Sequence, residues 1–261
     1  MAIRTSKKLP SGRAFISYAY QDEEALEQLN NVLQTYSVTP KPFPPINVAP
    51  SEMISNELID SIMDCRSLIY IDTPNAQGSR WVTLEREYAR RSGKPVFLYN
   101  PETALIELDE RPPLDLPVFP SYTREDKEKV DWIIKFMREE RFFDIFLESQ
   151  DLTAGDSWIK KIESAMYDRL KRGGYTVLFW SSKAAQSKWV QKEVEASLTD
   201  FPRQVFVSLL EDVDPPLALM EKQALRLYGE GPYGLDYRRV DDLIVYLYWF
   251  MQEQVSIKGE L

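Results

Sequence analysis

Two stretches of the chain nearly repeat each other: FISYAYQD at residues 15–22 and FPSYTRED at residues 119–126. A second pair follows in the same order, SRWVTLERE at residues 79–87 and SKWVQKEVE at residues 187–195. The shared positions include the uncommon residues Phe, Tyr and Trp, and the members of both pairs are separated by nearly equal lengths of chain. An ordered recurrence of this kind indicates a tandem duplication, with a few residues gained in the second copy.

Within each copy, short apolar runs alternate with segments of helical periodicity. In the first copy the runs at residues 14–18, 68–71 and 96–99 are typical of buried parallel strands. The second copy repeats them at residues 177–180 and 205–208. Strands that alternate with helices predict an α/β fold. We therefore interpret the chain as two tandem flavodoxin-like domains, each a parallel sheet with helices on both faces.

An aspartate stands at the predicted start of the first helix in each copy, Asp22 in the first and Asp126 in the second. Aspartate is favoured at helix N-caps because its carboxylate accepts hydrogen bonds from free backbone N–H groups. We therefore expect both residues to cap helices. Apolar residues at helical spacing follow them: Leu26, Leu29, Leu33 and Tyr36 in the first copy, and Val130, Ile133 and Met137 in the second.

The two domains are expected at residues 10–112 and 116–255. The proline-rich stretch from Pro101 to Pro120 is interpreted as the linker between them. Beyond Tyr99 the first copy shows no recognisable last strand or helix. The second copy has both, at residues 225–228 and 240–251. The first domain is therefore expected to be shortened at its C-terminal end.

The composition excludes several classes of function. The 261 residues include no histidine, which excludes a Ser-His-Asp triad and a His-ligated metal. Cys65 is the single cysteine, so an intrachain disulfide and a cysteine zinc cluster are excluded as well. We predict no metal site.

The charge balance bears on the partners. Lys and Arg number 32 against 41 Asp and Glu, which gives a formal net charge of −9. An acidic surface repels a phosphate backbone, so no nucleic acid partner is expected. The longest apolar run, at residues 243–251, covers about half of a membrane span, and residues 1–10 lack the apolar core of a signal peptide. We therefore expect no membrane partner and a cytoplasmic location.

The repeated windows resemble a known family. The sequence at residues 15–22 is similar to the first sequence box of Toll/interleukin-1 receptor (TIR) domains. DLTAGDSW at residues 151–158 looks like the loop that follows their second strand. The stretch at residues 187–193 resembles the helix that carries the catalytic glutamate of NAD-cleaving TIR domains. The resemblance covers nearly the whole chain, as two TIR domains in tandem.

This resemblance implies an activity. NAD-cleaving TIR proteins break the nicotinamide-ribose bond as hydrolases or cyclases, and in bacteria they commonly serve antiviral immune signalling. By the same resemblance, NAD⁺ would be a substrate rather than a permanently bound cofactor. Self-association into oligomers and binding to other TIR domains are also expected.

Candidate site residues come from the resemblance and from the residues themselves. Glu193, with Glu85 as its counterpart, is expected to be catalytic. Trp189 and Trp81 lie one helical turn before these glutamates and on the same helix face. The expected substrate-binding residues are Trp189, Trp81, Ser17, Tyr18, Ser121, Tyr122, Arg124, Gly155 and Ser187.

Two departures from the family pattern support an alternative. The first copy replaces the glycine-containing loop with PPINVAP at residues 44–50, and the second has Pro120 in its first strand. Proline removes a donor from the strand ladder. The alternative is therefore a non-catalytic scaffold or adaptor that binds other TIR domains. The sequence leaves open which copy is catalytic, and whether the product is linear or cyclic.

A third pattern invites a different interpretation. GEGPYG at residues 229–234 matches the G-x-G-x-x-G fingerprint of dinucleotide-binding folds. That fingerprint, however, follows the first strand of such a fold, whereas this one lies near the end of the chain. We interpret it as a loop.

Overall fold

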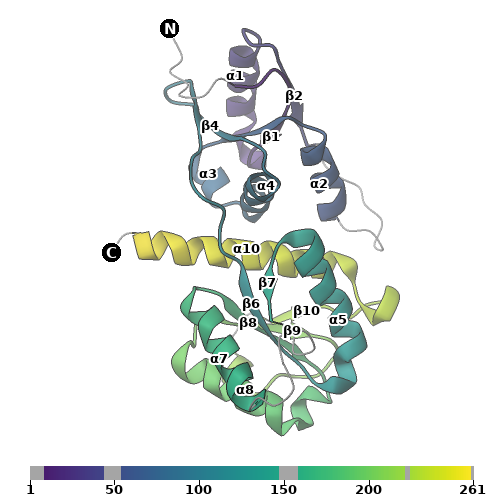
Figure 1. The fold of residues 1–261 in the computed structure, drawn as a ribbon. Helices are drawn as coiled ribbons and strands as arrows, with labels where there is room; N and C mark the ends of the chain where they lie inside the picture. Colours follow the sequence, from purple (N-terminus) through teal and green to yellow (C-terminus); the bar gives the residue numbers. More distant parts are fainter. Residues whose placement is uncertain (1–8, 44–53, 147–157, 221–223, 260–261) are drawn as a thin grey trace. The chain divides into compact units, whose positions relative to one another are not determined.

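The structure, a computed structural model, describes residues 9–43, 54–146, 158–220 and 224–259 (Figure 1). The chain divides into two compact units between Leu114 and Asp115, here called the first and the second domain. Among the helices of the described residues, none is both long enough and apolar enough to cross a bilayer.

The first domain contains a five-stranded sheet in the order β2-β1-β3-β4-β5. Strands β1 to β4 run parallel to their neighbours, and β5 runs antiparallel to β4. The elements are β1 (Gly12–Ser17), the 3-10 turn η1 (Tyr20–Asp22), α1 (Glu23–Leu33), β2 (Val38–Pro42), α2 (Ile54–Met63), β3 (Ser67–Ile71), α3 (Pro74–Gln77), α4 (Arg80–Arg91), β4 (Val96–Asn100) and β5 (Leu105–Leu108).

The second domain repeats this topology with a sheet in the order β10-β9-β8-β6-β7, parallel throughout. Counted within each domain, both sheets have the strand order 2-1-3-4-5 of flavodoxin-like folds, which confirms the predicted α/β class. The elements are β6 (Pro117–Ser121), η2 (Arg124–Asp126), α5 (Lys127–Lys135), the π-helical turn η3 (Phe136–Glu140), β7 (Asp144–Ile145), α7 (Trp158–Lys171), β8 (Tyr175–Trp180), η4 (Ala184–Gln186), α8 (Lys188–Asp200), β9 (Val205–Leu209), α9 (Leu217–Met220), β10 (Ala224–Arg226), η5 (Pro232–Gly234) and α10 (Tyr237–Gly259).

The expectation that the first domain lacks its last strand is wrong. After β4 the chain reverses through a tight turn, in which Ala104 has a positive φ of 53°, and returns as β5. Ile106 of β5 is buried in the core. A hairpin needs only a short turn, whereas a fifth parallel strand would need a long crossover. The described residues of the first domain contain no helix after β5, so the shortening concerns the last helix alone.

The proline-rich stretch is not one continuous linker. Pro101 lies in the turn between β4 and β5, and Pro117 and Pro120 lie inside β6. Pro120 is tolerated in this central strand because of its register. The carbonyl of Val118 faces β7, where it accepts a hydrogen bond from the Phe146 N–H at 3.4 Å, and Pro120 faces the same side. Pairing with β7 ends at Val118, so Pro120 removes no hydrogen bond from the ladder with β8.

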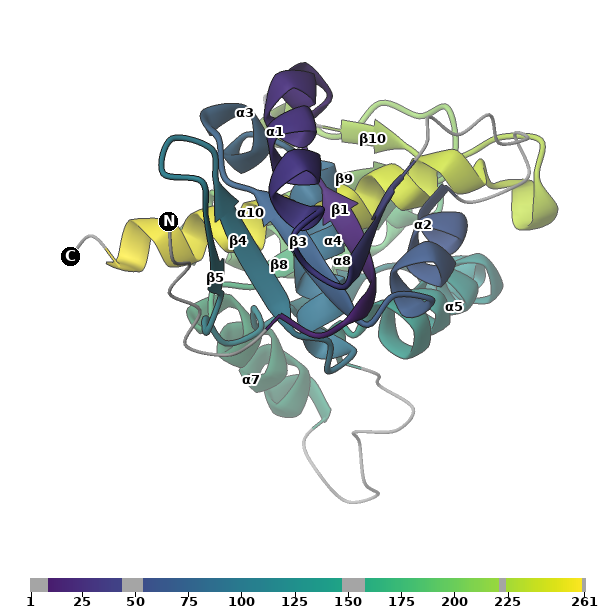
Figure 2. The same cartoon turned by 90° about the horizontal axis from the view of Figure 1, so that it is seen from above.

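The faces of the first sheet are covered by different helices (Figure 2). Ala14 and Ile16 of β1 pack with Leu29 of α1 in one apolar cluster. Successive strand residues point to opposite faces, so Ser17 points to the other face, which α4 covers. The end of β1 therefore presents a hydroxyl group to α4.

The second sheet is layered in the same way. Leu178 packs with Val194 of α8 on one face, and Phe206 contacts Phe250 of α10 on the other, with ring centroids 6.1 Å apart. Ser121, at the end of β6, is in register with Leu178 and so shares its face with α8. Both domains thus direct a serine from the end of the first strand toward the helix that was expected to carry the glutamate.

A close backbone approach in the second domain gives a test of the fold. Gly174 precedes β8, and a Cβ atom there would overlap the carbonyl oxygen of Pro117 and lie 2.8 Å from that of Arg169. We expect Gly174→Ala to lower the free energy of unfolding by about 1–3 kcal/mol, because backbone atoms on two sides would have to move. Denaturant unfolding measures this, with Gly78→Ala as the control, since a Cβ there meets backbone no nearer than 3.4 Å. Equal effects of the two substitutions would contradict the packing described.

Candidate functional site

The second domain brings three of the expected site residues into direct contact. The Ser121 hydroxyl donates a hydrogen bond to Oε2 of Glu193 at 2.6 Å. The indole Nε1–H of Trp189 donates to Oε1 of the same carboxylate, also at 2.6 Å. The two carboxylate oxygens therefore accept from different sides, one from β6 and the other from the preceding turn of α8. This arrangement fixes the orientation of the Glu193 carboxylate.

Local sequence explains why α8 presents Glu193 at this place. The Ser187 hydroxyl accepts a hydrogen bond from the Val190 N–H at 3.3 Å, so Ser187 is the N-cap of the helix. Val190 and Val194 are buried on the sheet side of α8. Anchored in this way, the helix turns its Trp189 and Glu193 side chains toward the end of β6. Ser187, expected to bind substrate, thus has a capping role in the structure.

The first domain contains the same pair. The Ser17 hydroxyl donates to Oε2 of Glu85 on α4, whose N-cap Ser79 accepts from the Val82 N–H at 3.4 Å. Within the part of the chain that the structure describes, no hydrogen bond joins Trp81 to Glu85. The sequence singled out the serines and the glutamates separately. The hydrogen bond that joins each serine to the glutamate of the helix on its face is shared by the two domains and is seen only in the structure.

The two glutamates differ in their surroundings. Glu85 is buried, with 8% of its surface exposed, and burial raises its pKa to about 8 although the hydrogen bond from Ser17 lowers it. Glu85 is therefore mostly a neutral acid at pH 7. Glu193 is only partly buried and keeps contact with solvent. Of the two, Glu193 is the more exposed.

These features agree with the comparison to known proteins. A family model described as "TIR domain" matches residues 14–116 and, a second time, residues 118–240. The chain belongs to the TIR domain family. The two matches confirm the tandem arrangement of TIR domains that the sequence repeats indicate.

Solved structures give weaker likenesses. The TIR domain of the Toll-related receptor TRR-2 from Hydra magnipapillata is 21% identical, over 42% of this chain and 82% of that one, with a TM-score of 0.37. The TIR domains of the activated Roq1 resistosome, which recognises the effector XopQ, are 16% identical over 72% and 98% of the two chains, with a TM-score of 0.25. Among curated proteins no match is found. The family assignment rests on the two segment matches.

The remaining expected residues of the two TIR domains are placed as follows. Tyr18 packs against the apolar cluster on the α1 side of the first sheet, away from Glu85. Tyr122 is partly buried directly after Ser121. Arg124 is exposed in η2, and no contact joins it to Glu193 among the described residues. Gly155 lies outside the described residues.

Asp22 and Asp126 do not cap helices, contrary to expectation. Neither side chain makes a capping hydrogen bond. The Asp22 carboxylate accepts instead from the Thr73 hydroxyl and, at 2.8 Å, from Nδ2 of Asn75. Asp126 accepts from the Ser181 hydroxyl at 2.5 Å and, on the same oxygen, from the Thr123 hydroxyl at 3.1 Å. Both aspartates are buried. Each carboxylate accepts a hydrogen bond from a hydroxyl group just after the third strand of its domain, and the local sequence does not reveal this partner.

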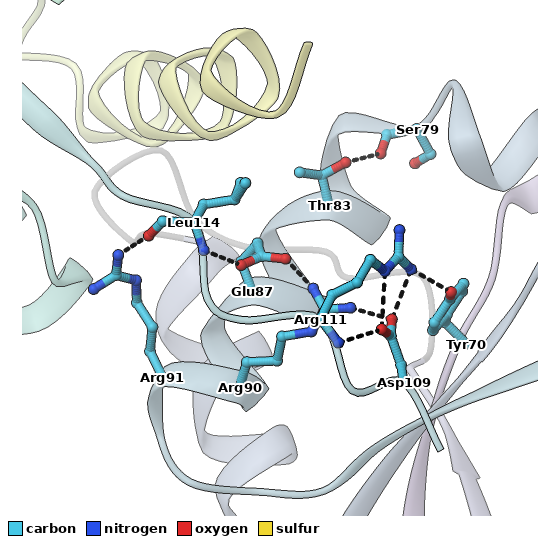
Figure 3. Close-up of polar contacts among 9 residues, drawn as sticks. All are labelled: Tyr70, Ser79, Thr83, Glu87, Arg90, Arg91, Asp109, Arg111 and Leu114. Carbon is cyan, nitrogen blue, oxygen red and sulfur yellow. Dashed lines mark hydrogen bonds and ion pairs between the residues drawn. The ribbon is translucent and has the colours of Figure 1, made fainter. Parts of the chain in front are cut away.

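A cluster of charged side chains in the first TIR domain was not foreseen (Figure 3). Asp109 forms ion pairs with Arg90 of α4 and with Arg111, whose guanidinium also donates to the Tyr70 hydroxyl at 2.6 Å. Burial by itself raises the pKa of Asp109, but the hydrogen bonds of Arg111 and the charge of Arg90 outweigh it and hold this pKa at about 2. Burial together with Asp109 raises the pKa of Tyr70 to about 12.

The same cluster holds the last residues of the domain. Glu87 accepts a hydrogen bond from the Leu114 N–H at 2.9 Å, and Arg91 donates to the Leu114 carbonyl (Figure 3). Both backbone groups of Leu114 are thus bound by α4. Arg90 and Arg111 pair with the carboxylates of Glu87 and Asp109, and we assign the cluster the structural role of fixing the segment that follows β5.

Two other features are distinct from the glutamate pairs. A groove of about 350 Å³ beside α8 is lined mainly by apolar residues, among them Trp180, Val194 and Leu198, and includes neither Ser121 nor Glu193. The glycine-rich segment at residues 229–234 is a closed loop, since the Gly229 N–H donates to the Gly234 carbonyl at 3.0 Å. This confirms its interpretation as a loop. In the described residues, no group of three acidic or Cys side chains could hold a metal ion.

The buried glutamate predicts how stability depends on pH. The folded first domain retains the Glu85 proton up to a pKa of about 8, whereas the unfolded chain releases it near the ordinary value of 4.5. Unfolding therefore becomes easier as the pH rises between these values. We expect Glu85→Gln to reduce this loss, so that the melting temperature of the variant falls less than that of the wild type between pH 5 and about pH 8.

Glu193→Gln serves as the matched control, because it makes the same change in the equivalent, partly exposed glutamate of the second domain. Thermal unfolding at several pH values measures the effect. An unchanged pH dependence in Glu85→Gln would contradict the raised pKa.

Proposed function

We propose that the second TIR domain cleaves NAD⁺ at the nicotinamide-ribose bond, with Glu193 as the catalytic carboxylate. The observation that supports this most directly is the geometry of Glu193, which is oriented by Ser121 and Trp189 while staying partly exposed. Membership of the TIR family, in which some proteins are NADases, supports it as well.

The chemistry demands little of the protein. Nicotinamide leaves as a neutral molecule, so no general acid has to protonate it. The ribose passes through an oxocarbenium-like transition state, which a nearby carboxylate stabilises electrostatically. A chain without histidine can supply this carboxylate.

The hydrogen bonds at Glu193 suit this role. A carboxylate has about four lone-pair sites, and Ser121 and Trp189 occupy two of them. In the proposed complex, ribose hydroxyl groups of NAD⁺ donate to this carboxylate as further partners. Because the carboxylate is held before substrate arrives, little reorganisation is needed in the transition state.

We propose that the first TIR domain is not catalytic. Glu85 is buried and, with a pKa of about 8, carries little negative charge at neutral pH. A neutral acid stabilises an oxocarbenium ion poorly. The scaffold role that the sequence left open is therefore best assigned to this domain, which would bind other TIR domains or its own copies and support assembly.

Nicotinamide release from NAD⁺ tests the assignment. We expect Glu193→Gln to lower turnover by at least about 100-fold, since it removes the charge that stabilises the transition state. Glu85→Gln is the matched control and should leave turnover within about twofold of the wild type. The assay is run at high protein concentration, so that assembly can occur.

Other outcomes would change the proposal. Loss of turnover in Glu85→Gln alone would move the catalytic centre to the first domain. Turnover that survives in the double variant would contradict both site assignments. If wild-type protein released no nicotinamide even when forced to oligomerise, the scaffold role would apply to the whole chain.

The indole of Trp189 gives a separate prediction. Trp189→Phe keeps an aromatic ring but removes the Nε1–H that binds Glu193. Since hydrogen bonds to charged groups contribute about 1.5–3 kcal/mol, we expect kcat to fall about tenfold or more. Steady-state kinetics of this variant, with Trp81→Phe as control, measure the effect. A kcat equal in both variants would show that the indole does not orient the glutamate.

The biological setting is part of the same proposal. In a bacterial host, cleavage of NAD⁺ would either deplete the cofactor pool or make an ADP-ribose-type signal during antiphage defence. The support for this setting is the family resemblance. Phage infection of cells that express the wild type or Glu193→Gln tests it, and equal plaque numbers would count against an antiphage role.

A further inference from the structure

A buried aspartate follows the first strand of each domain, and each has the same kind of partner. Asp126, which is 8% exposed, accepts from Ser181, which is fully buried after β8. Asp22, which is 6% exposed, accepts from Thr73 after β3. Removing a carboxylate from water is costly unless hydrogen bonds replace the lost solvation. The duplication kept this costly group and a hydroxyl partner in both domains.

Each hydroxyl also has a second hydrogen bond. The Ser181 Oγ accepts from the Ala184 N–H at 3.0 Å, at the start of η4. The Thr73 Oγ1 accepts from the Ala76 N–H at 3.0 Å and caps α3. The hydroxyl group therefore joins the aspartate to the turn that leads into the helix with the glutamate.

In the second domain, the two residues of this hydrogen bond lie on the two chain segments that lead to the candidate site. Asp126 lies at the end of the loop that begins at Ser121. On the other side, η4 continues through the Ser187 N–H, which donates to the Ala184 carbonyl at 3.1 Å, into α8 and Glu193. The hydrogen bond between Asp126 and Ser181 thus connects the loop after Ser121 to the segment that leads into α8 and Glu193.

We propose that Asp126 is a positioning residue for Glu193. Through Ser181 it holds the start of α8 at a fixed distance from the loop after β6, so that Ser121 and Trp189 bind the carboxylate together. Asp126 does not touch Glu193 and takes no part in bond breaking. This inference rests on the proposed function, because it concerns the same site.

The test is a double-mutant cycle of nicotinamide release with Asp126→Asn, Ser181→Ala and the combined variant. Asn keeps the shape of Asp but loses its charge and one acceptor oxygen, which weakens the hydrogen bond from Ser181, whereas Ala at position 181 removes the donating hydroxyl group. We expect each single variant to lower kcat by about 10- to 100-fold with KM changed less than about twofold, since misplacing a catalytic group acts on the chemical step. The combined variant should be no slower than the slower single variant, because both changes act on the same connection.

The matched control is the corresponding pair in the first domain, Asp22→Asn and Thr73→Ala. These variants weaken or remove the same kind of buried hydrogen bond and should lower the melting temperature similarly, with turnover unchanged. A purely structural role of Asp126 would make the two pairs behave alike. Equal loss of turnover in both pairs, or effects at Asp126 and Ser181 that multiply independently, would overturn the inference.

Glu193→Gln separates this inference from the proposed function. If Glu193→Gln is inactive while Asp126→Asn and Ser181→Ala are both fully active, the proposed function stands and the positioning role is wrong. If Glu193→Gln retains wild-type turnover, the proposed function fails instead.

In that case, or if the wild type shows no turnover, amide hydrogen exchange decides the positioning role. Asp126→Asn should speed exchange at residues 184–190 relative to the rest of the second domain. Unchanged exchange there would overturn it.

Discussion

One contact organises each domain: the hydrogen bond from a serine hydroxyl at the end of the first strand to a glutamate on the helix after the third strand. It requires that the strand end with the serine pointing to that helix, and that the helix begin at a capping serine six residues before its glutamate. The parallel sheet provides the first condition, because its register sets which face each side chain occupies. Helix capping provides the second.

The hydrogen bond between serine and glutamate has different surroundings in the two domains. In the first, the glutamate is enclosed and burial raises its pKa to about 8, so the contact is a neutral hydrogen bond inside the protein. In the second, the glutamate stays partly exposed and gains a second donor from Trp189. A similar divergence affects the domain ends, where the first sheet closes with an antiparallel hairpin and the second with a parallel strand. The two domains thus share one framework and differ in the exposure of the glutamate.

Sequence patterns were sufficient for the repetitive parts of the fold. The apolar runs became buried strands, as with residues 68–71 in β3 and 177–180 in β8, since a continuous apolar run is stable only between two layers of helices. Val130, Ile133 and Met137 face the core at the spacing expected of a helix. The prediction of helix caps was wrong because each aspartate had two possible sets of hydrogen-bond donors. Asp22 and Asp126 fit the cap pattern locally, but hydroxyl groups from the next strand end bind their carboxylates instead.

The sequence by itself determined the duplication and the α/β class. It also identified the serines, tryptophans and glutamates that are candidates for the site. These follow from periodicity and from the recurrence of residue types, both of which can be found from the order of residues along the chain. Only the tertiary structure decided which serine binds which glutamate, that Glu85 is enclosed and Glu193 accessible, and that Asp126 joins Ser181. Burial and long-range hydrogen bonds depend on what packs against a residue from elsewhere in the chain. No local pattern contains that information.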